Sequence, residues 1–411
     1  MAGFLWLFIA ILCGLFLSHY FLTSLPVVMH MFIGPALGLI VAAEFTFILS
    51  LVFGFNAVTI IASLIIVSIA SIFLLLSQSE NIRFKFSYRL LLIALGSYWP
   101  LIIAFVTIIP FAVFIFTTKV LNPTSYGLTT GSGGLWADTA MHAGFTMSLV
   151  SQGLPPQNPL YAGRQLVYPL LVNFLSAIMV KLGTSLRWAF VMPQIIFFIG
   201  FVALLYIFGK KTVGNRAVFF AFLIFFLGWG LGFTRYLEHG LKTHNWTVTQ
   251  EYTHDYKTYH MHNVLTGLIF PERSFLPGLV IGLLLAYLFL NDYSKQSKPY
   301  TLTPNPLITG FLLGILPLWH THTFIFFAAA AAFWWAKILF DAFLKKKQTN
   351  ELTKLLIIFI FTATVFALPA LLWIKLNLTE SFLHFSAGWI LPAGNILIFW
   401  LLNTGLVIPL A

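Results

Sequence analysis

Charged side chains are scarce in this chain. Asp, Glu, Lys and Arg make up 8% of the 411 residues, and hydrophobic residues make up 60%; an ordinary soluble domain is about 25% charged. Lys and Arg outnumber Asp and Glu by 22 to 11, a net charge of +11. These cations lie in short segments between apolar runs, where they orient spanning helices, so we exclude a nucleic-acid partner. The mean hydropathy of +0.94 predicts a polytopic protein embedded in the lipid bilayer.

The sequence also has few cysteines and lacks the features of a signal peptide, which excludes further kinds of site and segment. Cys13 is the single cysteine, which excludes an internal disulfide and a Cys-based metal site. The first apolar run, 3–23, lacks a basic flank and a small-residue cleavage site, so we expect a retained helix, not a signal peptide. We find no internal repeat and no second soluble domain. The last apolar run reaches Ala411 without a polar tail, which indicates either a compact protein or an incomplete one.

Long apolar runs predict an all-α protein with about 11 transmembrane helices, because a bilayer core requires about 20 apolar residues per helix. The predicted spans are 3–23, 27–53, 57–77, 90–117, 187–209, 217–233, 275–291, 307–319, 325–342, 353–375 and the final run to Ala411. Segment 168–183 is too short for a span, and we expect a juxtamembrane helix in the outer interface.

The distribution of Lys and Arg predicts the orientation. The predicted inner loops (78–90, 209–216, 291–306 and 337–354) hold 13 Lys and Arg residues. The predicted outer regions (118–187, 234–274 and 375–392) hold 9, although they are more than twice as long in total. This asymmetry places the N-terminus and both long loops outside. We therefore expect a plasma-membrane protein whose site faces the exterior.

The first long polar interruption holds the strongest candidate site. Asp138 and His142 are spaced i, i+4, so they share one face if the segment is helical. Asp138 is either the N-cap of that helix or a general base. His142 is a structural or a substrate-binding residue. The pair offers two metal ligands at most, so a divalent cation is possible and no cofactor is certain.

Downstream, the proline-rich segment 154–169 carries the polar side chains of Arg164 and Tyr168, which could contact a ligand. Arg164 is either an interfacial anchor or a phosphate-binding residue. Both are included among the candidate substrate-binding residues.

The second long loop, 234–274, is rich in His. It contains His239, His244, His254, His260 and His262, but no spacing matches a defined metal site. At its end, Glu272 and Arg273 precede a span, where an Arg can meet a lipid phosphate or merely snorkel to the interface.

Three further polar residues lie at or within spans. His320 and His322 alternate in a turn between two spans and are functional candidates by position. Glu44 lies in the middle of a span, where we expect a carboxyl hydrogen-bonded to a neighbouring helix.

The run WADTAMHAGFTMSLVSQGLPPQNPLYAG, followed by YPLLVNFLSAIMVKLG, a span and GKKTVGNR, resembles the GT-C membrane glycosyltransferases. That superfamily includes protein O-mannosyltransferases and aminoarabinose transferases. The resemblance covers residues 90–342, the expected core. Residues 1–89 form a variable three-helix addition, and 343–411 hold the C-terminal helices.

The resemblance implies a function. Such enzymes transfer a sugar from a polyprenyl-phosphate carrier to a lipid, glycan or protein acceptor on the outer face. Asp138 matches the position of the family's Asp that serves as base or orients the acceptor, and Arg273 is placed to bind the donor phosphate. The chain has no glycine-rich nucleotide loop, consistent with a lipid-linked donor. The alternatives are a non-catalytic relative and a transporter or a lipid- or metal-binding protein, with Glu44, His320 and His322 lining a polar pathway.

Overall fold

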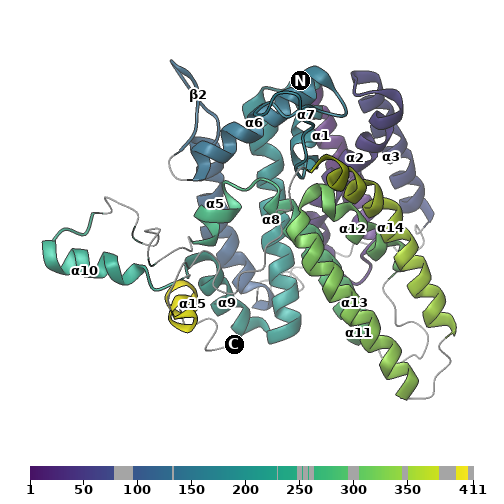
Figure 1. Cartoon of the computed structure of the whole chain (residues 1–411). Helices are drawn as coiled ribbons and strands as arrows, with labels where there is room; N and C mark the ends of the chain where they lie inside the picture. Colours follow the sequence, from purple (N-terminus) through teal and green to yellow (C-terminus); the bar gives the residue numbers. More distant parts are fainter. Residues whose placement is uncertain are drawn as a thin grey trace.

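The structure is a computed structural model that describes residues 1–77, 96–131, 134–228, 230–247, 252, 258, 263–294, 305–344, 350–378 and 395–405. Almost all of it is helical (Figure 1). Seven described helices are long and apolar enough to cross a bilayer. They are α1 (Ala2–Phe21), α2 (Val27–Phe53), α3 (Ala57–Ser77), α5 (Trp99–Lys119), α8 (Leu186–Val213), α13 (Thr321–Leu344) and α14 (Asn350–Asn377).

The remaining elements are shorter or more polar. They are the hairpin of β1 (Asn122–Thr124) and β2 (Gly127–Thr129), α6 (Gly134–Gln152), α7 (Leu171–Lys181), α9 (Asn215–Leu227), α10 (Phe233–Thr243), the π-helix η2 (Leu265–Ile269), α11 (Phe275–Ser294), α12 (Pro306–Trp319) and α15 (Ile396–Thr404). The polytopic all-α class is therefore confirmed. The number of eleven spans stays a prediction, because α9 and α12 have 13 and 14 residues.

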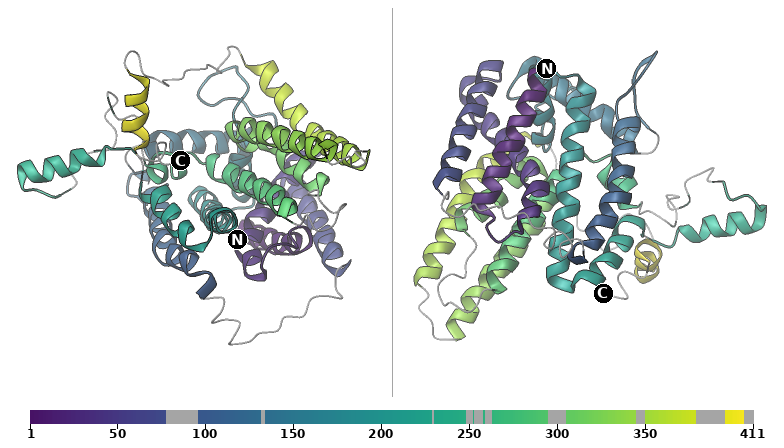
Figure 2. Two further views of the ribbon diagram at one scale, coloured as in Figure 1. Left: turned by 90° about the horizontal axis from the view of Figure 1, so that it is seen from below. Right: turned by 180° about the vertical axis from the view of Figure 1, so that it is seen from behind.

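The outward faces of the long helices are apolar, as expected for a surface in contact with lipid. Val58 and Phe73 of α3 and Phe361 of α14 are each more than half exposed. In water such a surface would promote aggregation, whereas in a bilayer it contacts lipid tails without a free-energy penalty. Helix α10 differs, because it extends away from the helical body in all views (Figures 1 and 2).

Helices α1 and α2 form the closest helix pair at the N-terminus. Gly14 of α1 faces Gly34 and Gly38 of α2, and a Cβ added at Gly38 would overlap the Ala10 carbonyl oxygen. Small residues at such a crossing let two backbones approach, which is how helices associate where the hydrophobic effect is absent. The pair also contacts α7, and α2 packs on α8, so the N-terminal helices are built into the body.

Helix α7 corrects the expectation for 168–183. It is short, as predicted, but it does not lie on an interface. Every residue from Leu171 to Met179 is buried, and α7 contacts α1, α2, α6, α8 and α12. Its apolar sequence reflects a position enclosed by protein.

Candidate functional site

Helix α6 presents Asp138 and His142 one turn apart, as the sequence predicted. The alternative that Asp138 is the N-cap is wrong, because α6 begins at Gly134, one turn earlier. Asp138 is half-buried and His142 is fully buried. Burial raises the pKa of the Asp138 carboxyl, since desolvation penalises its charged form.

Tyr168 and Glu272 complete an acidic cluster with Asp138. The Tyr168 hydroxyl donates a hydrogen bond to Glu272 Oε2 at 3.4 Å. Burial raises the pKa of Glu272, and the nearby negative charge of Asp138 raises it further. The pKa of Tyr168 is raised by burial first and by the charge of Glu272 second. Tyr168 is therefore a hydrogen-bond donor at neutral pH, and the two carboxylates share one electrostatic environment.

Arg273 points away from this cluster, which corrects its expected position at the lipid interface. Its side chain is 3% exposed and lies 3.5 Å from the centre of the Phe190 ring. Nη1 donates to Asn173 Oδ1 at 3.1 Å, and Nη2 donates to Ser176 Oγ at 2.8 Å. Burial lowers the pKa of Arg273 to about 9, so the guanidinium remains charged at neutral pH. Its contacts tie the start of α11 to α7 and α8.

Asn173 connects Arg273 to His142. His142 Nδ1 lies 3.0 Å from Asn173 Oδ1, which accepts from Arg273 as well. Because this oxygen can only accept, Nδ1 must carry the His142 proton. Burial lowers the pKa of His142 to about 3, and the positive charge of Arg273 acts in the same direction. His142 is a neutral ring with a fixed tautomer, packed edge-on against Tyr168 at 5.5 Å between ring centres.

A cavity of about 520 Å³ opens beside this cluster, and we call it the outer cavity. Its polar lining residues are Tyr168, Glu272, Ser274, His320, Thr321 and His322. The structure therefore brings together four of the predicted site residues, Tyr168, Glu272, His320 and His322, from segments far apart in the sequence. Asp138 and His142 are not among its lining residues, and His142 packs against Tyr168, which is one of them.

His320 is held in one protonation form in this cavity. His320 Nδ1 accepts from the backbone N–H of Thr323 at 3.3 Å and lies 2.7 Å from Thr323 Oγ1, whose hydroxyl can donate to the same nitrogen. Burial lowers the pKa of His320 to about 4, and His322 contributes to the same shift. With Nδ1 accepting, the proton of the neutral ring resides on Nε2, which makes Nε2 a hydrogen-bond donor.

Arg164 is not part of this cluster. Its side chain is exposed, and its backbone closes the loop through hydrogen bonds with Asn158 and Tyr161. In the second loop, His239 and His244 lie on and just after α10, whereas His254, His260 and His262 lie outside the described residues. Within the described ranges no three His, Cys, Asp or Glu side chains are placed to hold a metal. Asp138 and Glu272 offer two carboxylates, so a divalent cation would need further ligands from a bound substrate.

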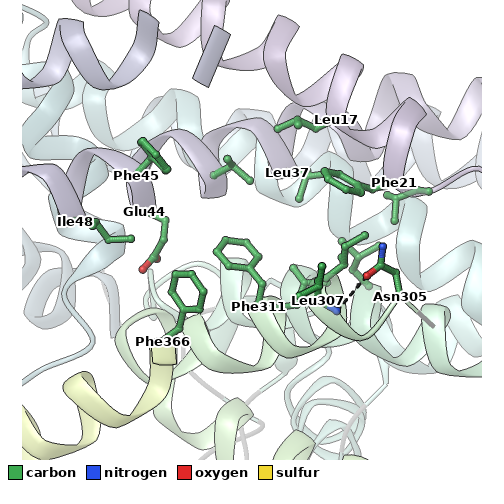
Figure 3. A pocket seen from close by; sticks show the side chains of 15 residues that line it. Leu17, Phe21, Leu37, Glu44, Phe45, Ile48, Asn305, Leu307, Phe311 and Phe366 are labelled. Atoms are coloured by element: carbon green, nitrogen blue, oxygen red, sulfur yellow. Dashed lines mark hydrogen bonds between the residues drawn. The ribbon is translucent and has the colours of Figure 1, made fainter. Parts of the chain in front are cut away.

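Two apolar cavities lie near the outer cavity, since Leu170 and Trp373 of one directly adjoin Pro169 and Ile374 of the outer one in sequence. The middle cavity, about 630 Å³, is lined by residues that include Leu51, Leu154, Leu170, Leu318 and Trp373. The inner cavity, about 340 Å³, lies between α1, α2, α12 and α14 (Figure 3). Both are lined by Glu44, Ile48 and Phe366.

Glu44 marks the junction of these two cavities. Its Oε2 accepts a hydrogen bond from Trp319 Nε1 at 3.2 Å, so the expected bond to a neighbouring helix is present. Figure 3 shows the Glu44 carboxyl directed toward Phe366. Glu44 thus lines apolar cavities, whereas His320 and His322 line the outer one, and no polar pathway joins them among the described residues.

Sequence reasoning did not single out Asn173, Ser176 or Trp319. Asn173 and Ser176 are polar residues within an apolar helix, which is the signal that would have marked them. Searches of protein-family profiles, curated proteins and solved structures find no match to this chain.

Proposed function

We propose that this protein is a membrane glycosyltransferase that moves a sugar from a polyprenyl-phosphate donor to an acceptor hydroxyl at the membrane surface. The observation that carries the proposal is that a polar cavity lined by Tyr168 and Glu272 lies next to two apolar cavities. A lipid-linked sugar has the same division into a polar head and a hydrocarbon chain. The resemblance of 90–342 to the GT-C enzymes points to the same donor class.

A row of residues along α14 supports this arrangement. Phe366, Ala370 and Ile374 of α14, and Leu378 directly after its last residue, are spaced i, i+4 and share one face. Phe366 lines the inner and middle cavities, Ala370 lines the middle one, and Ile374 and Leu378 line the outer one. The three cavities therefore follow each other along one side of α14.

In the proposed reaction, the acceptor hydroxyl displaces the lipid phosphate in one step, with inversion at the sugar. Asp138 removes the hydroxyl proton as the new bond to the anomeric carbon forms. Its raised pKa suits a general base, because basicity near the working pH makes proton transfer efficient. Tyr168 and Glu272 orient the sugar hydroxyls as donor and acceptor.

The leaving phosphate is already an anion, so the protein mainly positions it and supplies donors. His320 fits this role, because its ring lines the outer cavity and Nδ1 accepts from Thr323, which leaves the proton on Nε2 to donate to a ligand. Arg273 was expected to bind the phosphate directly. Its buried contacts assign it to holding α7, α8 and α11 in place instead. Any role for Arg164 at the phosphate stays a prediction.

The test is sugar transfer in liposomes from a panel of radiolabelled polyprenyl-phosphate sugars. Asp138→Asn should lose at least about a hundredfold in rate, the usual contribution of a general base. Asp341→Asn is the matched control, because Asp341 pairs with Lys337 on α13 and lines none of the three cavities. Transfer that is equal in wild type and Asp138→Asn would refute the assignment. Donor binding without turnover in the wild type would indicate a non-catalytic relative.

A further inference from the structure

The inner cavity shares no lining residue with the outer one, and the proposed chemistry does not require it. Its wall is formed in part by α1 and α2, from the N-terminal segment that the GT-C resemblance does not cover. The lining is apolar except for Glu44 and Asn305, one near each end in Figure 3. Asn305 is occupied as the cap of α12, where its side chain accepts from Leu307 N.

Helix α2 lines the passage along its length. Leu37, Val41, Glu44, Ile48 and Leu51 follow a helical repeat of three or four residues, so they form one stripe. Leu37 and Val41 line the inner cavity, Glu44 and Ile48 line both, and Leu51 lines the middle one. At 1.5 Å per residue this stripe is about 21 Å long, most of the roughly 30 Å thickness of a bilayer core.

Glu44, which is hydrogen-bonded to Trp319, lies at the midpoint of this stripe. The stripe covers about 10 Å from Leu51 to Glu44 and about 10 Å more from Glu44 to Leu37. A short hydrocarbon chain that starts in the outer cavity ends before Glu44. A long chain must pass the Glu44–Trp319 pair and enter the inner cavity.

We infer that the inner cavity receives the far end of the donor's isoprenoid chain, so that α2 makes the protein selective for long-chain isoprenyl phosphates. This inference rests on the proposed function, because it takes its occupant to be the donor lipid. The occupant is assigned from the order of the cavities: the inner and middle ones share Glu44, Ile48 and Phe366, and Ala370 of the middle one is one turn of α14 from Ile374 of the outer one. A long chain buries more apolar surface than a short one and therefore binds more tightly.

The first measurement is binding of sugar-free citronellyl, geranylgeranyl and undecaprenyl phosphates to the detergent-purified full chain, by native mass spectrometry. The wild type should bind the long chain at least about tenfold more tightly than the short one. Val41→Trp places an indole in the inner cavity and should remove this preference, with short-chain affinity changed less than about twofold. Ile65→Trp is the matched control, because Ile65 is 52% exposed on the outer face of α3.

The retained short-chain binding shows that the Val41→Trp protein is folded. If that variant does not fold, Phe311→Ala enlarges the inner cavity from α12 and should strengthen long-chain binding relative to short. Equal affinity for all chain lengths in the wild type would overturn the inference. Displacement of undecaprenyl phosphate by equimolar phosphatidylglycerol would overturn it also, because the cavity would then be a site for bilayer lipid. The binding assay contains no sugar, so it tests chain-length selectivity alone. Failure of the proposed sugar transfer is detected separately, in the liposome assay.

Discussion

The Tyr168 hydroxyl donates to the Glu272 carboxylate across 104 residues of sequence, and this bond joins the first long polar loop to the second. Tyr168 precedes α7 and Glu272 precedes α11, so the contact lies where two helix starts meet. Asp138 is close enough to affect the pKa of both side chains. The reacting groups are therefore assembled by the ends of helices that the packed body holds in place.

Glu272→Gln is expected to leave the acid limb of the pH–rate profile in place. Burial holds the pKa of Asp138 above its ordinary value, and a general base is active only when ionised, so the rate falls as the pH drops through that raised pKa. The charge of Asp138 raises the pKa of Glu272, so Asp138 ionises first, while the Glu272 carboxyl is neutral like the amide that replaces it. The measurement is kcat/KM against pH. An acid limb that moves to lower pH in the variant would show that Glu272 ionises before Asp138.

Arg273→Ala is expected to lower the free energy of unfolding by about 2–4 kcal/mol. The variant loses hydrogen bonds from a charged donor to Asn173 and Ser176 and the stacking on Phe190. Thermal unfolding in detergent measures the effect. Arg164→Ala is the matched control, because this exposed side chain should change stability by less than about 0.5 kcal/mol. Equal effects of the two variants would contradict the structural role of Arg273.

Stability is expected to fall as the pH is lowered below the ordinary pKa of histidine. Burial holds the pKa of His142 at about 3 and that of His320 at about 4. Between these values and about 6.5 the unfolded chain binds more protons than the folded one, so each residue removes up to about 1.4 kcal/mol per pH unit.

His142→Gln should therefore flatten the dependence of the unfolding temperature on pH. The side-chain amide can still donate to Asn173 but does not titrate. His244→Gln, at an exposed position after α10, controls for the substitution itself. The same slope in wild type and His142→Gln would show that His142 is not buried as a neutral ring.

Gly38→Leu is expected to separate α1 from α2 and to cost at least about 2 kcal/mol of stability. A Cβ at this position meets backbone atoms of Ala10 and Gly14, which cannot rotate away. Gly96→Ala is the control, because an added Cβ there has no neighbour within 4 Å. An unchanged unfolding temperature for Gly38→Leu would contradict the close crossing of these helices.

The long spanning helices could be predicted from the sequence, and the contacts inside the site could not. Helices α2 and α3 cover the expected residues 27–53 and 57–77, because long apolar runs end there at Pro26, Gly54 and Asn56. Membrane insertion depends on such local apolar length.

The hydrogen-bond partner of Arg273 could not be predicted in this way. Asn173 is 100 residues away and lies in a segment that apolar length alone suggested was interfacial. Tertiary packing decides such a pairing, and a single sequence carries no pattern for it. The placement of Tyr168, Glu272, His320 and His322 around one cavity was likewise open, although each had been singled out as a polar residue at a helix end.

The buried position of α7 has a consequence for biosynthesis. A helix of 11 residues is about 16 Å long and cannot be retained in the membrane by its own length. It leaves the ribosome after α1 and α2 but before α8 and α12, which complete its enclosure. The hydrogen bond from Arg273 to Asn173 therefore cannot form until α8 and the start of α11 have been synthesised. Chains arrested before that point cannot have a formed site, so the reacting groups of this protein come together only at a late stage of its synthesis.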